Sequence, residues 1–102
     1  MNDKFLPIGT VVLLKGAKNN VMITGYFIYS TEKKDEIFDY GACPYPVGIV
    51  QANSSIAFNH SDIEKVINLG YIDDEQKKLN KLLLEHEQDI LNKFKEEMSN
   101  KQ

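Results

Sequence analysis

The strongest strand signal in this chain is the apolar stretch Val21-Met22-Ile23-Thr24-Gly25-Tyr26-Phe27-Ile28-Tyr29. Its β-branched and aromatic residues favour an extended backbone, as strands of a sheet require. Gly25 interrupts the run, and a glycine inside a strand favours a bulge or a sharp bend. We therefore expect one long, bent strand here.

A shorter strand is expected just before it, over the run Thr10-Val11-Val12-Leu13-Leu14. Gly9 and Gly16 stand on either side of this run, and glycines are typical of strand boundaries. The polar residues 18–20 separate it from the long strand by a short turn. The two strands are therefore predicted to form a hairpin.

Three further segments are candidate strands: Ile37-Phe38-Asp39-Tyr40, which Gly41 breaks, and the short runs 49–50 and 55–58. Between them lies Cys43-Pro44-Tyr45-Pro46-Val47-Gly48, where two prolines remove backbone donors and exclude a central strand. A rigid extended segment is expected there, and a cis bond at Tyr45-Pro46 is compatible with it. The fold class is therefore α+β, with a small antiparallel β-barrel or a strongly bent sheet of about five strands.

The pattern becomes helical after His60. Ser61 is followed three residues later by Glu64, which is the spacing of a capping box, and Gly70 is a good helix stop. Apolar residues recur between them at helical spacing, at Ile63, Val66 and Ile67. A short helix is therefore predicted near residues 62–69.

A second, longer helix is predicted to begin at Asp73 and Asp74, whose carboxylates suit the positive end of a helix dipole, and to run to about Met98. All glycines and prolines lie at or before Gly70. The expected organisation is a β-rich domain over residues 1–72 and an amphipathic C-terminal helix over 73–102, within the same structural unit.

The long helix has more apolar surface than a chain of this size needs for its core. One stripe is predicted to face the home domain: Leu79, Leu82, Leu83, His86, Ile90 and Phe94. On its shoulder, Leu84, Leu91 and Met98 recur at every seventh residue, and we predict that they bind another protein or a second copy. The alternative is that all these leucines pack within the chain.

Composition excludes several classes of protein. The chain has 102 residues, a net charge of -3 and 12 basic residues, all of them lysines. A large multi-domain enzyme does not fit this length, and an acidic chain without arginine suits nucleic acid poorly. One cysteine forms no internal disulfide, and with no signal pattern or apolar run of membrane-spanning length a cytoplasmic location is expected.

The chemistry-bearing residues have structural explanations. Cys43-Pro44-Tyr45 resembles a redox motif, but Pro46 stands where the second cysteine is needed. His60, Ser61 and Asp62 are adjacent in sequence, whereas a hydrolytic triad converges from separate segments. No catalytic, cofactor-binding or metal-binding residues are therefore expected, and the chain is predicted not to be an enzyme. Tyr45 is a candidate exposed aromatic for protein contact.

Several spaced motifs resemble a small family known as domain of unknown function 4176. They are Leu6-Pro7-Ile8-Gly9-Thr10-Val11-Val12-Leu13-Leu14-Lys15-Gly16, Val21-Met22-Ile23-Thr24-Gly25-Tyr26, Tyr45-Pro46-Val47-Gly48, Phe58-Asn59-His60-Ser61-Asp62-Ile63 and Gly70-Tyr71. The family occurs in Gram-positive bacteria beside genes for type VII (ESX-like) secretion and LXG polymorphic toxins. The resemblance covers residues 5–75 and leaves out most of the long helix.

This resemblance implies a non-catalytic accessory protein that binds an LXG toxin as a targeting factor or chaperone. The expected partner is the helical region of such a toxin or another small secretion-associated protein, through Leu84, Leu91, Met98 and Tyr45. One alternative is an immunity protein that masks the toxin's active domain. Others are a generic protein-interaction barrel, a homo-oligomer and, least favoured by charge, a nucleic-acid-binding barrel.

Overall fold

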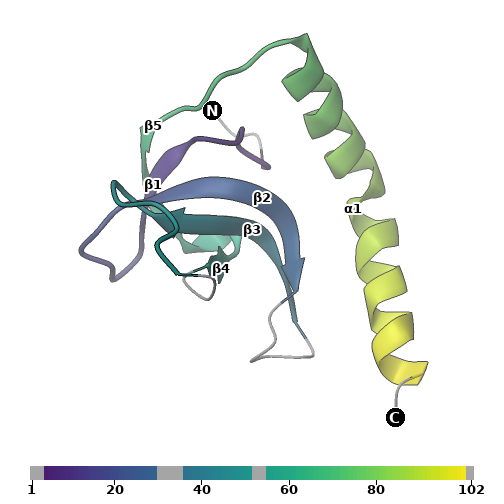
Figure 1. Cartoon of the computed structure of the whole chain (residues 1–102). Helices are drawn as coiled ribbons and strands as arrows, with labels where there is room; N and C mark the ends of the chain where they lie inside the picture. The colour runs from purple at the N-terminus through teal and green to yellow at the C-terminus, as the bar shows by residue number, and fades with distance from the viewer. Residues whose placement is uncertain (1–3, 30–35, 52–54, 101–102) are drawn as a thin grey trace.

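Five antiparallel strands form one bent, open sheet beside a long helix (Figure 1). The computed structural model describes residues 4–29, 36–51 and 55–100. The elements are β1 (Val11–Leu14), β2 (Val21–Tyr29), β3 (Ile37–Pro44), β4 (Ile56–Phe58), β5 (Ile63–Asn68) and α1 (Asp74–Asn100). The strand order β4-β3-β2-β1-β5 leaves β4 and β5 at opposite edges. The α+β class is confirmed, and of the two predicted architectures the bent sheet is the one formed.

The β2–β3 pair forms the centre of the sheet and contains the predicted bend. Its register shifts between Ile23 and Gly25, which is the expected irregularity. The predicted break at Gly41 is wrong, because β3 continues through it to Pro44. A Cβ atom on the buried Gly41 would lie only 2.6 Å from Cγ1 of Ile28, so the Ile28 side chain occupies the space that a larger residue would need.

Residues 45–50 leave the sheet in a turn at the end of β3. The Tyr45-Pro46 bond is cis, as the sequence allowed. The Gly48 N–H donates to the Pro44 carbonyl oxygen at 2.8 Å and closes the turn. The predicted strand at residues 49–50 is wrong: both residues lie outside the sheet with exposed side chains.

The predicted short helix near residues 62–69 is also wrong. A single 3-10 turn at His60–Asp62 is followed by β5, which pairs antiparallel with β1. The capping role expected of Ser61 and Glu64 belongs to Asn59, whose N–H donates to Asp62 Oδ2 at 2.9 Å. The strand is favoured because half of its residues are β-branched, namely Ile63, Val66 and Ile67.

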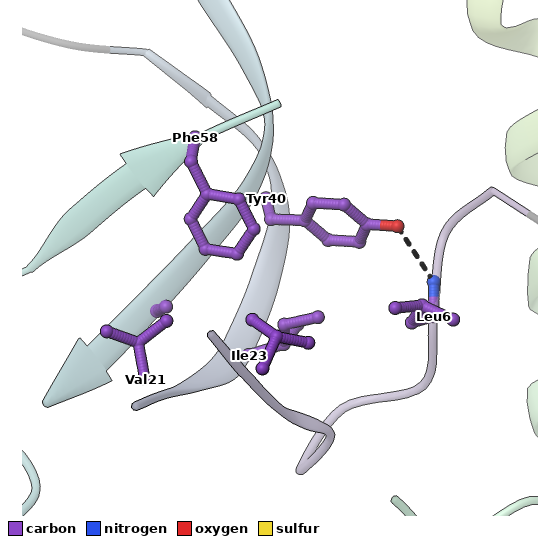
Figure 2. Packing of buried hydrophobic residues seen from close by; sticks show 7 residues of the cluster. Leu6, Val21, Ile23, Tyr40 and Phe58 are labelled. Carbon is purple, nitrogen blue, oxygen red and sulfur yellow. Dashed lines mark hydrogen bonds between the residues drawn. The ribbon is translucent and has the colours of Figure 1, made fainter. Parts of the chain in front are cut away.

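The core lies between the sheet and the N-terminal segment (Figure 2). Tyr40 is its largest fully buried side chain, and its ring centroid is 5.2 Å from that of Phe58. The buried cluster consists of Leu6, Val12, Val21, Ile23, Tyr40, Ala42 and Phe58. Four strands and the N-terminal segment therefore contribute to one core.

The chain crosses itself closely where residues 8–10 meet Gly70. Thr10 is fully buried, and its Oγ1 accepts a hydrogen bond from the Gly70 N–H at 3.0 Å. A Cβ atom on Gly70 would lie 2.2 Å from the Ile8 carbonyl oxygen, which is well inside van der Waals contact. Only glycine fits this crossing, which brings together the first and the last of the sequence motifs.

The long helix begins as predicted. Asp73 Oδ1 accepts a hydrogen bond from the Gln76 N–H at 2.9 Å and caps the first turn. The helix has 27 residues, a length of roughly 40 Å at about 1.5 Å per residue. None of its described side chains is buried, so it lies on the body of the domain and not within it. Within the described ranges, no helix is long and apolar enough to cross a membrane.

We predict that Gly70→Ala lowers the free energy of unfolding by about 2 kcal/mol or more, because the new methyl group meets backbone atoms that have little room to move. Urea unfolding followed by circular dichroism measures this change. Gly25→Ala is the matched control: its Cβ atom meets only Ile28 Cδ1, at 3.7 Å. An equal loss in both variants would contradict the crossing as the cause.

Candidate functional site

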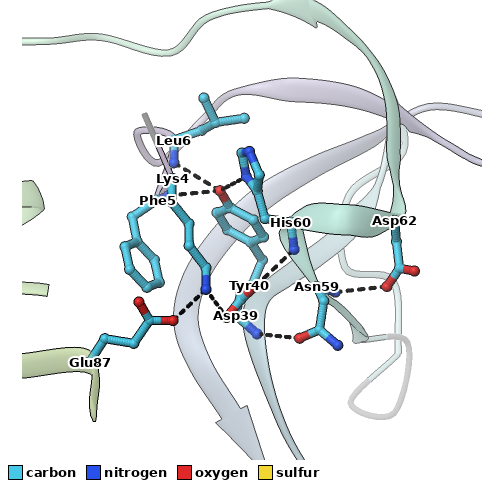
Figure 3. A network of polar contacts seen from close by, with 9 residues as sticks. All are labelled: Lys4, Phe5, Leu6, Asp39, Tyr40, Asn59, His60, Asp62 and Glu87. Atoms are coloured by element: carbon cyan, nitrogen blue, oxygen red, sulfur yellow. Dashed lines mark hydrogen bonds and ion pairs between the residues drawn. The ribbon is translucent and has the colours of Figure 1, made fainter. Parts of the chain in front are cut away.

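The first half of α1 is fastened to the N-terminal segment by polar contacts. Asn80 Nδ2 donates to the carbonyl oxygens of Lys4 and Phe5, at 3.2 and 3.0 Å. The Lys4 ammonium forms an ion pair with Glu87 of α1 and another with Asp39 of β3, the latter at 3.3 Å (Figure 3). Burial opposes the charged form of Lys4, but these carboxylates outweigh burial and raise the pKa of the ammonium.

Tyr40 connects the N-terminal segment to the 3-10 turn. Its hydroxyl accepts hydrogen bonds from the backbone N–H groups of Phe5 and Leu6, at 2.9 and 3.1 Å, and lies 2.7 Å from Nδ1 of His60 (Figure 3). A hydroxyl has one hydrogen, so we infer that it is donated to an unprotonated Nδ1. Burial raises the pKa of Tyr40 to about 12, although the two N–H donors act in the opposite direction.

The side of α1 that carries Leu84 and Leu91, called its lateral side below, is partly exposed to solvent. Leu84 is 46% exposed, and Leu91 is partly buried. The side chain of Met98 lies outside the described residues. The structure thus describes the side chains of two of the three predicted shoulder residues. Of these two, Leu84 is exposed enough to contact a partner.

Tyr45 is 47% exposed, as a residue that contacts a partner would be. It lies in the turn after β3, and this turn is at the end of the sheet away from α1 (Figure 1). Its neighbours Val47, Ile49 and Val50 are also exposed. The structure therefore separates Tyr45 from the predicted helical site, and the two would contact different parts of a partner.

The predicted inner stripe of α1 is only partly correct. Leu83 and Ile90 are partly buried, but Leu82 is 52% exposed and the His86 imidazole is open to solvent beside Asp89. Half of the partly buried positions of α1 are polar: Gln76, Asn80 and Glu87. Asn80 and Glu87 meet backbone carbonyls and the Lys4 ammonium, which need polar partners, and Gln76 lies beside the Tyr26 hydroxyl.

A second exposed apolar surface lies along the edge strand β5. Val66, Ile67 and Leu69 are exposed, and with Leu6 and Asn68 they line a groove of about 400 Å³. This surface was not expected from the sequence, because the apolar spacing of residues 63–69 predicted a helix there. Their β-branched side chains were the signal that favours a strand.

The chemistry-bearing residues have structural roles where the chain is described. The Cys43 thiol is buried. His60 lies within hydrogen-bonding distance of the Tyr40 hydroxyl, and Asp62 accepts a hydrogen bond from the Asn59 N–H. The partners of these two side chains are therefore not the members of a Ser-His-Asp triad. Among the described residues, no group of three or more His, Cys, Asp or Glu side chains is placed to hold a metal ion.

These features define a small α+β domain with an open sheet and a projecting amphipathic helix. The chain belongs to the family described as "Domain of unknown function (DUF4176)", whose model matches residues 5–79. This is the family that the sequence motifs resemble. The match includes the five strands and the first turns of α1, so most of the helix lies beyond it. No curated protein and no solved structure matches the chain significantly.

We predict that Tyr40→Phe destabilises the domain by about 2 kcal/mol, because the buried N–H groups of Phe5 and Leu6 lose their acceptor. Equilibrium unfolding in urea measures the change. Tyr45→Phe removes the same atom from an exposed tyrosine and should cost less than about 0.5 kcal/mol. Equal stability of both variants would contradict the connecting role of Tyr40.

Stability should also fall in alkaline solution. The pKa of Tyr40 is about 12 in the folded chain, against 10.0 for an ordinary tyrosine. Between these values the unfolded chain releases the proton and the folded chain keeps it, so the free energy of unfolding decreases as the pH rises from 10 to 12. Urea titrations across this range should show a smaller decrease for Tyr40→Phe; identical decreases would disprove the assignment.

Proposed function

We propose that this chain is a non-catalytic accessory protein of type VII secretion, which binds the helical region of an LXG toxin in the cytoplasm as a targeting factor or chaperone. The observation that carries the proposal is the lateral side of α1. The helix is held on the domain by its first half, and Leu84 near its middle is still almost half exposed.

An exposed leucine by itself is ordinary on a soluble domain. Leu84 is different because it belongs to a heptad-spaced pair with Leu91 on a helix that is much longer than its fastened part. Helices associate through apolar residues at this spacing, each side chain fitting between side chains of the facing helix. A helical partner is therefore the class of molecule that this surface fits best.

The accessory role and the secretion context both rest on the resemblance of the motifs in residues 5–75 to the family. The toxin is thus the partner to test first. The apolar turn at residues 45–50 and the edge strand β5 are additional surfaces that a large partner can reach.

We predict that Leu84→Ser weakens the complex with the neighbouring LXG toxin by about tenfold, as loss of a central apolar contact does. Leu82→Ser is the control, because it makes the same change on α1 at a residue that is 52% exposed but outside the heptad pair. Co-purification and calorimetry with the full-length chain measure both.

The two halves of the toxin should be tested separately. Binding to the N-terminal helical half supports the proposal. Binding to the C-terminal toxic half alone would replace it with the immunity function. If neither half binds, the proposed function is wrong.

A further inference from the structure

Lysines extend the heptad pair of α1 at both ends. Along one side of the helix the sequence positions increase by 4, 3, 4, 3 and 4 residues, which is the spacing of a coiled-coil seam. The residues at these positions, called the lateral seam below, are Lys77, Lys81, Leu84, Gln88, Leu91 and Lys95. From Lys81 onward, leucines alternate with Lys81, Gln88 and Lys95, whereas Lys77 stands where the next two heptads have Leu84 and Leu91.

The lateral seam is exposed at every position except Leu91, which is partly buried, and it carries a net positive charge. Lys77, Lys81 and Lys95 are exposed. Among the described residues the ion pairs involve only Lys4 and His86 as cations, so these three lysines have no carboxylate partner. No Asp or Glu stands among these six positions, although the helix as a whole has more acidic than basic residues. The same spacing continued to the start of α1 adds Asp74, so the seam keeps a net positive charge.

A second copy of the chain fits this surface poorly. Pairing two lateral seams, in either direction, brings the lysines of one helix close to the lysines of the other. Lysine or another polar residue at a core position of a coiled coil restricts which partners can pair. The charge pattern therefore favours a different helix with the opposite sign.

We propose that the lateral seam binds an acidic amphipathic helix of another chain. This partner would place apolar side chains on Leu84 and Leu91 and carboxylates opposite Lys81 and Lys95. The seam spans roughly 27 Å at about 1.5 Å per residue, so the partner helix needs about three heptads to cover it. The inference rests on the proposed function in treating α1 as a protein-binding helix, and it adds the charge and the length of the partner.

Two synthetic helices of three heptads test the proposal on the full-length protein. Both have leucine at every d position; one has glutamate and the other lysine at every a position, so each disfavours pairing with itself. We expect calorimetry at low salt to show that the glutamate peptide binds about tenfold more tightly than the lysine peptide, and that added salt reduces the difference.

Charge reversal on the protein identifies the residues. Lys81→Glu/Lys95→Glu should invert the preference, so that the lysine peptide binds more tightly. Lys78→Glu/Lys93→Glu makes the same charge change on other sides of α1 and should keep the original preference. Circular dichroism shows whether the variants stay folded, which is expected because all four lysines are exposed.

The inference is overturned if the two peptides bind equally, if neither binds, or if the two double variants behave alike. A dimer in sedimentation that Lys81→Glu/Lys95→Glu abolishes would identify a second copy as the occupant instead. The outcomes are separable from those of the toxin experiment. If Lys81→Glu/Lys95→Glu inverts the peptide preference but the toxin does not bind, only the toxin is excluded as the partner. If the toxin binds this double variant and the unchanged protein equally well, only this inference is wrong.

Discussion

The N-terminal segment, residues 4–10, supplies backbone groups that hold β2, β3 and α1. Its carbonyl at Leu6 accepts the Tyr26 hydroxyl of β2, and its N–H at Gly9 donates to Ile23 of the same strand. Tyr40 of β3 and Asn80 of α1 bind other backbone groups of this segment. This short irregular segment thus acts as a second layer. It covers the core on one face of the sheet, and α1 is attached to it.

This arrangement has a conformational cost at Phe5. Its φ angle of +63° lies in the left-handed region, which costs a residue with a side chain roughly 1–2 kcal/mol. The Phe5 ring is fully buried, and its centroid is 5.1 Å from that of Phe27 and 5.9 Å from that of Tyr26. Aromatic packing of this kind offsets the strain and holds the segment in the one backbone conformation that presents its N–H groups to Tyr40.

Local signals were sufficient for part of the fold and for part of the candidate site. The long bent strand of residues 21–29 and the helix start at Asp73 were predictable, because a β-rich run and a capping carboxylate act on their own neighbourhood. The β5 strand was not, because its apolar spacing also fits a helix and only pairing with β1 distinguishes the two. The exposure of Leu84 followed from periodicity. The polar residues on the inner side of α1 could not be predicted, because their role depends on which groups of the distant N-terminal segment lie against the helix.

The one-sided fastening of α1 also determines how the domain opens locally. In the described part of the chain, the polar contacts between α1 and the rest of the domain lie between Gln76 and Glu87, so the later turns are free of them. Those turns can unwind without loss of any of these contacts, and their backbone amides therefore exchange with solvent by local fraying. The amides of β2 and β3 exchange only when the core opens. A single helix thus belongs to two cooperative units, one shared with the sheet and one of its own.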